Sequence, residues 1–261
     1  MAEPRPAKNS GSRVRAESCG FGMSSIAFKP IRIGQPGDAL AGLYAPAVEG
    51  KPTVLVVPPF PHEWQRSYRL FALLSQSLAA HGFGSLRFDP TGCGDSSGED
   101  EAFCLSQLLA DCRGSLEWLR ARQVGAVVLL GVRAGALPAS ALAVEESLVW
   151  IGWQAVASGA EYLASLEARE ALELRNTRRY GARLPEAGID PGCLLGHRTH
   201  PQLRAQLRSA RLATSPRFSV DGDLPSGLSA WVEEIDLATP FALPHVRTLA
   251  AVLASRLDAY P

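Results

Sequence analysis

The clearest structural signal in the chain is the stretch Ala126-Val-Val-Leu-Leu-Gly-Val-Arg-Ala-Gly-Ala-Leu-Pro-Ala-Ser140. It predicts a short apolar strand, a tight turn between Gly131 and Gly135, and a helix built from small residues. An apolar run without alternation indicates a strand that is buried on both faces, as in a parallel sheet. The turn would therefore present Arg133 at the end of a central strand and at the N-terminus of a helix.

A strand, a turn bounded by glycines and a helix, in this order, form the pattern of a nucleophile elbow, Gly-x-Ser-x-Gly. The position of the serine holds Arg133. A guanidinium group cannot be deprotonated in a protein, so covalent acyl-enzyme chemistry at this position is excluded. Two interpretations stay open: Arg133 binds an anionic ligand beside backbone N–H groups, or it pairs with an acid such as Glu63, Asp89 or Asp95.

Composition and charge exclude several classes of function. The 261 residues suffice for one large α/β domain or two small ones. The 26 basic and 26 acidic residues balance, which argues against a broad nucleic-acid surface. No apolar run approaches the roughly 18 residues of a membrane span. The five cysteines are widely spaced and indicate neither a disulfide framework nor a zinc site, so we expect a cytoplasmic protein.

The order of predicted elements indicates an α/β fold with a doubly wound, mostly parallel sheet. A hairpin is expected first, from residues 26–33 and 39–44 around the turn cluster 34–37. Apolar runs and helical periodicity then predict strands and helices in alternation. The strands are expected at 53–57, 85–89, 126–130 and 148–152, and the helices at 65–81 and 102–122.

We divide the chain into four parts. Residues 1–24, rich in Arg, Ser, Gly and Pro, are expected to form a disordered leader; they lack the apolar segment of a secretory signal. Residues 25–153 form the core of the sheet. Residues 154–225 are expected to be a cap-like helical insertion, with helices near 161–179 and 201–211. Residues 226–261 would complete the core with a strand at 227–235 and a helix at 245–257.

Candidate site residues come from the predicted carboxyl ends of the strands, where such sheets bind ligands. The backbone N–H groups of Phe60 and Ala134 are candidate oxyanion donors, although Pro58-Pro-Phe-Pro61 is equally a rigid turn. His245 follows the elbow in the chain, as the catalytic histidine of a hydrolase does, but it is equally a helix-capping or exposed residue. The candidate ligand-binding residues are Arg133, Ala134, Phe60, Glu63, Asp95 and His245.

Other features of the sequence give weaker indications. The candidate acids, none of which follows a clear strand, are Asp221, Asp223, Glu233, Glu234 and Asp236. Ser158, Ser96 and Ser97 are possible displaced nucleophiles without a recognisable base, and His62 is expected near the mouth of the site. No cofactor is predicted, because the loop 91–98 lacks the lysine of a phosphate-binding loop. No metal site is predicted either, because His197 and His200 lack a carboxylate at ligand spacing.

Four stretches together resemble a known family. Residues 54–67, 86–98, 130–135 and 150–163 resemble the α/β-hydrolases of bacterial exosortase systems, and most closely their second type, exosortase A system-associated hydrolase 2. The resemblance implies an α/β-hydrolase fold and a partner in protein sorting or polysaccharide production. Arginine in the elbow resembles a trait of that family. The family label implies hydrolysis, whereas Gly131-Val-Arg-Ala-Gly135 departs from the serine pattern.

We therefore expect a hydrolase-fold protein without serine-hydrolase activity, which binds a small or acyl-bearing ligand, or a protein partner, around Arg133. The alternative is an active hydrolase of ester or related acyl bonds, in which water or a displaced serine attacks and Arg133 clamps an oxyanion or carboxylate.

Overall fold

A seven-stranded sheet forms the centre of the computed structural model, which describes residues 28–175, 192–221 and 243–259. The strand order is β1-β2-β4-β3-β5-β6-β9. β1 pairs with β2 and β2 pairs with β4 in antiparallel fashion, and all the other pairs are parallel. The strands are β1 Lys29–Gln35, β2 Asp38–Ala45, β3 Thr53–Val57, β4 Gly84–Phe88, β5 Val127–Val132, β6 Val149–Trp153 and β9 Phe218–Ser219.

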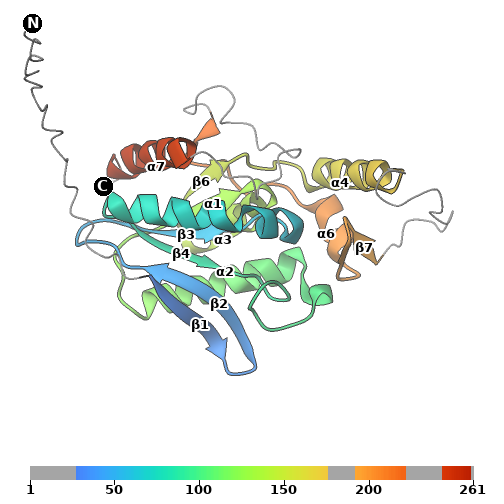
Figure 1. Cartoon of the computed structure of the whole chain (residues 1–261), viewed down its shortest axis with the longest axis horizontal. Helices are drawn as coiled ribbons and strands as arrows, with labels where there is room; N and C mark the ends of the chain where they lie inside the picture. Colours follow the sequence, from blue (N-terminus) through green and yellow to red (C-terminus); the bar gives the residue numbers. More distant parts are fainter. Residues whose placement is uncertain (1–27, 176–191, 222–242, 260–261) are drawn as a thin grey trace, which may run out of the picture.

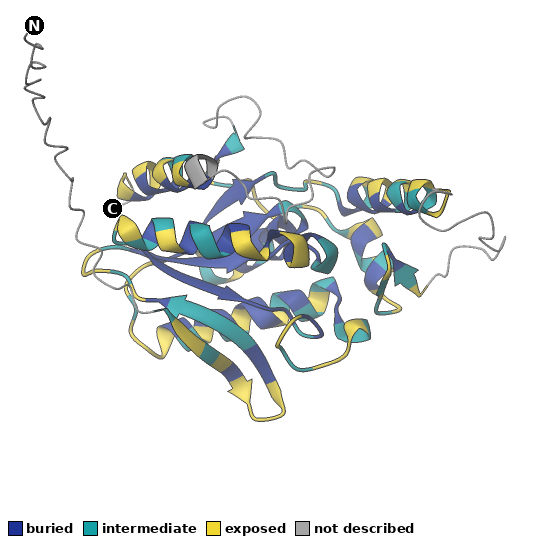
Figure 2. Cartoon of the chain, viewed as in Figure 1, coloured by how far each residue is buried: buried dark blue, intermediate teal, exposed yellow. Residues whose placement is uncertain are grey.

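Helices cover both faces of this sheet (Figure 1). α1 Pro61–Ala80 and α7 Leu243–Asp258 pack on one face, and α2 Leu105–Arg120 and α3 Ala136–Glu146 pack on the other. Successive side chains of a strand point to opposite faces, so Val54 and Val56 join the α1–α7 core while Leu55 and Val57 join the α2–α3 core. The central strands are buried throughout (Figure 2), which explains their uninterrupted apolar sequences.

The remaining elements gather beyond the carboxyl ends of the parallel strands (Figure 1). They are α4 Gly159–Leu174, α6 Leu203–Ser209 and a small hairpin of β7 Cys193–Leu194 with β8 His197–Arg198. Tyr162, Leu163 and Leu166 of α4 and Leu203 and Leu207 of α6 belong to the same buried cluster as α2 and α3. The predicted helical stretch after the sixth strand therefore packs directly on the core of the sheet.

The doubly wound, mostly parallel sheet and its edge hairpin confirm the sequence prediction. The helix expected at 65–81 instead begins at Pro61, because proline fits the first position of a helix, where no N–H is needed. The helix expected at 102–122 spans Leu105–Arg120 and follows a separate turn of 3₁₀ helix at Asp100–Ala102.

Residues 154–225, which we assigned to a cap-like insertion, include β9, and β9 pairs with β6 in the main sheet. A strand of two residues gives no periodicity that a sequence pattern can reveal. The predicted leader 1–24 and the predicted strand 227–235 lie outside the described residues. The domain boundaries themselves remain a prediction.

Candidate functional site

The turn after β5 has the geometry of an elbow. β5 ends at Val132, one turn of 3₁₀ helix spans Arg133–Gly135, and α3 begins at Ala136. Arg133 has a φ of 51°, in the left-handed region, which costs a residue other than glycine about 1–2 kcal/mol. Such strain persists only where the surrounding structure imposes it, and it is typical of functional turns.

Close approach of the backbone explains both glycines of the turn. A β-carbon at Gly131 would lie 2.8 Å from Cα of Ala136. A β-carbon at Gly135 would lie 2.3 Å from the carbonyl oxygen of Pro58. Both distances are shorter than a carbon atom tolerates, so the helix can pack this close to β3 and β5 only with glycine at these positions.

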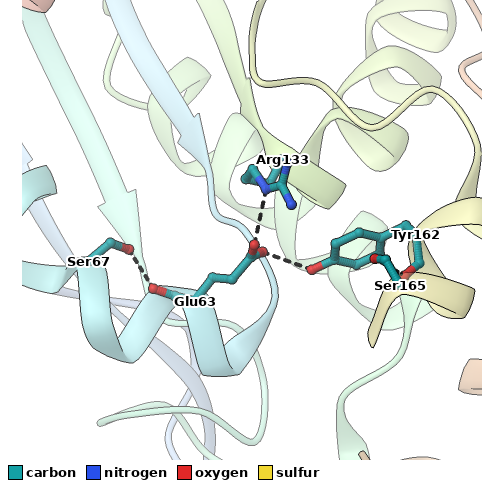
Figure 3. A network of polar contacts seen from close by, with 5 residues as sticks. All are labelled: Glu63, Ser67, Arg133, Tyr162 and Ser165. Carbon is teal, nitrogen blue, oxygen red and sulfur yellow. Dashed lines mark hydrogen bonds and ion pairs between the residues drawn. The ribbon is translucent and has the colours of Figure 1, made fainter. Parts of the chain in front are cut away.

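Arg133 forms an ion pair with Glu63 at the start of α1 (Figure 3). Its Nε donates to Oε1 of Glu63 at 3.0 Å, and the hydroxyl of Tyr162 donates to Oε2 at 2.8 Å. Glu63 and Tyr162 are each only 4% exposed. Of the three acids that we considered for Arg133, Glu63 is the partner that the structure shows.

The network ties together three elements that are far apart in sequence. Glu63 comes from the first turn of α1, where the helix dipole favours a negative charge, and Tyr162 comes from α4. Ser67 donates to the backbone oxygen of Glu63 at 2.7 Å, and Ser165 donates to that of Tyr162 at 2.6 Å (Figure 3). A buried carboxylate needs a charged partner and further hydrogen bonds, and Glu63 has both.

The other predicted site residues are distributed as follows. Phe60 precedes α1, and its ring packs edge-on against Tyr162 with the centroids 5.4 Å apart. Ala134 follows Arg133 and is fully buried. Asp95 lies instead on an exposed loop beside the edge hairpin, where Arg32 donates to its backbone oxygen. His245 lies in the first turn of α7, and its side chain is outside the described part of the structure.

Tyr162 and Gln154 have site roles that sequence reasoning missed. Gln154, with a φ of 49°, follows β6 as Arg133 follows β5. Its backbone N–H and its Nε2 donate to Asp221, at 3.0 and 3.1 Å, and the Ser219 hydroxyl donates at 2.6 Å. Asp221 follows β9, a strand of two residues that no sequence pattern reveals. No pattern in the sequence marks Tyr162, which has ordinary helical spacing.

An open hollow of about 360 Å³ lies beside this network. Its polar lining residues come from the ends of β5, β6 and β9 and from the first two turns of α4. They are Arg133, Gln154, Ser158, Glu161, Tyr162, Ser165 and Asp221. The hollow lies at the carboxyl ends of the parallel strands, where sheets of this kind bind ligands.

The serine hydroxyls near the site have backbone partners. Ser158 caps α4 by accepting from the N–H of Glu161, Ser96 donates to the carbonyl of Asp89, and Ser97 accepts from the N–H of Ala39. Over the described residues with described side chains, no serine hydroxyl hydrogen-bonds a histidine ring. The serine–histidine pair of a serine hydrolase is thus not seen in that part of the chain.

His62, expected at the mouth of the site, lies in the first turn of α1. Burial, and then the positive charges of Arg169, His197, Arg66 and Arg133, lower the pKa of His62 to about 3. Its imidazole is therefore neutral at physiological pH and able to donate or to accept one hydrogen bond at each ring nitrogen.

Comparison with known proteins gives only structural likenesses. No protein-family model matches the chain, and no curated protein matches it. A putative hydrolase from Agrobacterium vitis is 20% identical with a TM-score of 0.46, covering 69% of this chain and 72% of that one. The ferulic-acid-bound Est1E of Butyrivibrio proteoclasticus is 17% identical with a TM-score of 0.48, covering 70% and 72%. The esterase Pf2001 of Pyrococcus furiosus is 20% identical with a TM-score of 0.45, covering 62% and 58%.

At such low identity a likeness concerns the fold alone, and the sheet order, the flanking helices and the elbow after β5 define that fold independently. The chain has an α/β-hydrolase fold. Fold does not fix function, so the chemistry must be argued from the site itself. Among the described helices, none is long and apolar enough to cross a membrane.

Proposed function

We propose that this chain is a hydrolase-fold protein that binds a small acyl-bearing ligand, or a protein partner, at the Arg133 hollow without serine-hydrolase chemistry. One observation carries the proposal: the residue at the strained apex of the elbow is Arg133, and its guanidinium is paired with buried Glu63. The position from which a nucleophile would attack is occupied by a cation, and a cation cannot form an acyl-enzyme.

The lining of the hollow supports a ligand with an acyl or carboxylate oxygen. Arg133 supplies N–H donors at the edge of the hollow, and guanidinium groups suit planar oxygen pairs. Ser158 and Ser165 add hydroxyl groups, and the carboxylates of Glu161 and Asp221 would accept hydrogen bonds from N–H or O–H groups of the ligand. The resemblance found in the sequence suggests that a protein partner would belong to a sorting or polysaccharide system.

A second candidate, a hydrolase of unusual mechanism, is favoured by Asp221. This carboxylate is held by Gln154 and Ser219 at the end of β9, beside the same hollow as Arg133. A fixed carboxylate is able to orient an attacking water, and Arg133 would then stabilise the developing oxyanion.

The test is turnover of short- and medium-chain nitrophenyl esters together with fluorophosphonate labelling. Wild type, Arg133→Ser and the surface control Arg113→Ser are compared, since Arg113 forms an exposed ion pair with Glu145. We expect neither turnover nor labelling in the wild type and the control. Labelling gained by Arg133→Ser would show that the rest of the hydrolase site survives.

Labelling of the wild type would overturn the proposal, because it requires a nucleophile. Turnover without labelling would support the second candidate, and Asp221→Asn should then abolish that turnover. A ligand of the first candidate should bind the wild type and lose affinity in Arg133→Ser, which isothermal calorimetry can measure.

A further inference from the structure

A second hollow, of about 140 Å³, lies between α1, α4 and the turn that joins β7 to β8. It shares no lining residue with the Arg133 hollow. Its lining residues are His62, Arg66, Arg169, Glu170, Glu173, Leu174, Leu195 and Gly196. A hollow of this size restricts any ligand to a small molecule.

Glu170 is the most informative residue of this hollow. It is only 7% exposed, and its Oε1 accepts the backbone N–H of Leu195 at 2.9 Å. Its other oxygen, Oε2, is buried and has no hydrogen-bond partner among the described residues. Leaving a buried charged oxygen without a donor costs more than leaving a neutral group, so Oε2 calls for a donor from a bound molecule.

His62 provides a second buried atom without a partner. Its Nε2 is inaccessible to solvent and forms no hydrogen bond within the described ranges. The neutral ring lines the same hollow as Glu170 and is able to donate to an oxygen or accept from an N–H group. Native proteins leave few buried polar atoms without partners, so two among the residues that line one small hollow need an explanation.

Charges of both signs surround these two atoms. Arg66 and Arg169 line the hollow, and neither forms an ion pair with another described residue. Glu170 and Glu173 lie on the same lining, one helical turn apart on α4. A simple anion would leave Oε2 of Glu170 without a donor, and a metal cation would be repelled by the two arginines.

We propose that this hollow binds a small zwitterion, a free α-amino acid with a short side chain. Its ammonium group donates to Oε2 of Glu170, and its carboxylate accepts from Arg66, Arg169 and Nε2 of His62. Charge-assisted hydrogen bonds of this kind are roughly twice as strong as neutral ones, which suits recognition of a ligand with few atoms. Leu174 and Leu195 of the lining provide apolar contact for a short side chain.

The experiment is calorimetric titration of the full chain with glycine, alanine, serine and glutamate. N-Acetylalanine, which lacks the ammonium group, and alanine amide, which lacks the carboxylate, are titrated in parallel. We expect at least one short amino acid to bind, and its two blocked forms to bind about tenfold more weakly or not at all. Absence of binding by glycine, alanine and serine would overturn the proposal, whether or not glutamate binds.

Variants locate the site. Glu170→Gln keeps a side-chain oxygen for the N–H of Leu195, so the turn should remain folded while affinity falls about tenfold. Glu161→Gln, on the same helix but lining the Arg133 hollow, should leave affinity unchanged. Equal affinity in Glu170→Gln, or a loss in Glu161→Gln, would place the ligand elsewhere and contradict the proposal. Arg133→Ser should also leave amino-acid binding intact. The outcome of this test is therefore distinguishable from the outcome of the test of the proposed function.

Discussion

The Nε atom of Arg133 lies 3.0 Å from Oε1 of Glu63, so the apex of the elbow is tied to the first turn of α1. Tyr162 donates to the other oxygen of the same carboxylate, so α4 is included in the link. The three side chains meet at the carboxyl end of β5, beside the open hollow of about 360 Å³. Arginine at the apex therefore determines both the charge and the packing of this turn.

Removing the charge of Glu63 should destabilise the fold. Glu63→Gln keeps the shape of the side chain but removes the negative charge that pairs with the largely buried guanidinium of Arg133. We expect the free energy of unfolding to fall by about 3 kcal/mol, as measured by urea denaturation. The matched control Glu145→Gln breaks the exposed pair with Arg113 and should cost at most about 1 kcal/mol. Equal losses in the two variants would show that the buried pair is not structural.

The glycine that ends the elbow should tolerate no side chain. In Gly135→Ala the new β-carbon would meet the carbonyl oxygens of Pro58 and Val57, which belong to the backbone and cannot move aside. We expect a loss of about 3 kcal/mol or more in thermal or urea unfolding. Gly114→Ala, in α2 with nothing within 4 Å of its β-carbon, should instead gain about 0.5–1 kcal/mol. A stable Gly135→Ala variant would mean that the turn is more adaptable than its geometry indicates.

The sequence predicted the central architecture because that architecture rests on burial. The uninterrupted apolar run 126–130 is buried on both faces inside the parallel sheet, and the glycines around Arg133 allow the next helix to approach it closely. The same reasoning named Glu63 as a possible partner of Arg133, and the ion pair confirms that interpretation. Long apolar segments and tight turns leave strong patterns in the sequence. The first residue of a helix, such as Pro61 of α1, depends on weaker residue preferences at helix ends.

The parts that the sequence did not reveal depend on tertiary contacts. Tyr162 has the spacing of any core residue on a helix, and only the approach of α4 to Glu63 brings its hydroxyl to the site. Asp221 was one of several acids, and only the pairing of the two-residue β9 with β6 places it beside Gln154. Asp95, by contrast, was expected near Arg133 and lies on an exposed loop bonded to Arg32.

The cysteines should differ in reactivity. Burial raises the pKa of the Cys93 thiol to about 12 and raises that of Cys112 well above its ordinary value, so both remain protonated and inert at neutral pH. Cys193, in β7, is partly exposed. Limited maleimide labelling of the native protein, followed by peptide mass spectrometry, should modify Cys193 well before Cys93 and Cys112. Comparable rates at all three thiols would contradict the burial of the α2 core, and labelling in denaturant provides the control.

Acid should destabilise the protein through His62. Its folded-state pKa is lowered to about 3 by burial and by neighbouring cations, led by Arg169, while in the unfolded chain it would be near 6.5. Between these values the unfolded state binds a proton that the folded state does not, so stability is lost as the pH falls. The slope from this group approaches about 1.4 kcal/mol per pH unit.

In His62→Gln the stability measured by urea unfolding should fall less steeply from pH 6.5 downwards than in the wild type. The control Gly114→Ala changes no ionisable group and should keep the wild-type slope. If His62→Gln keeps that slope too, His62 is charged in the folded protein, and the buried environment assigned to its ring is wrong.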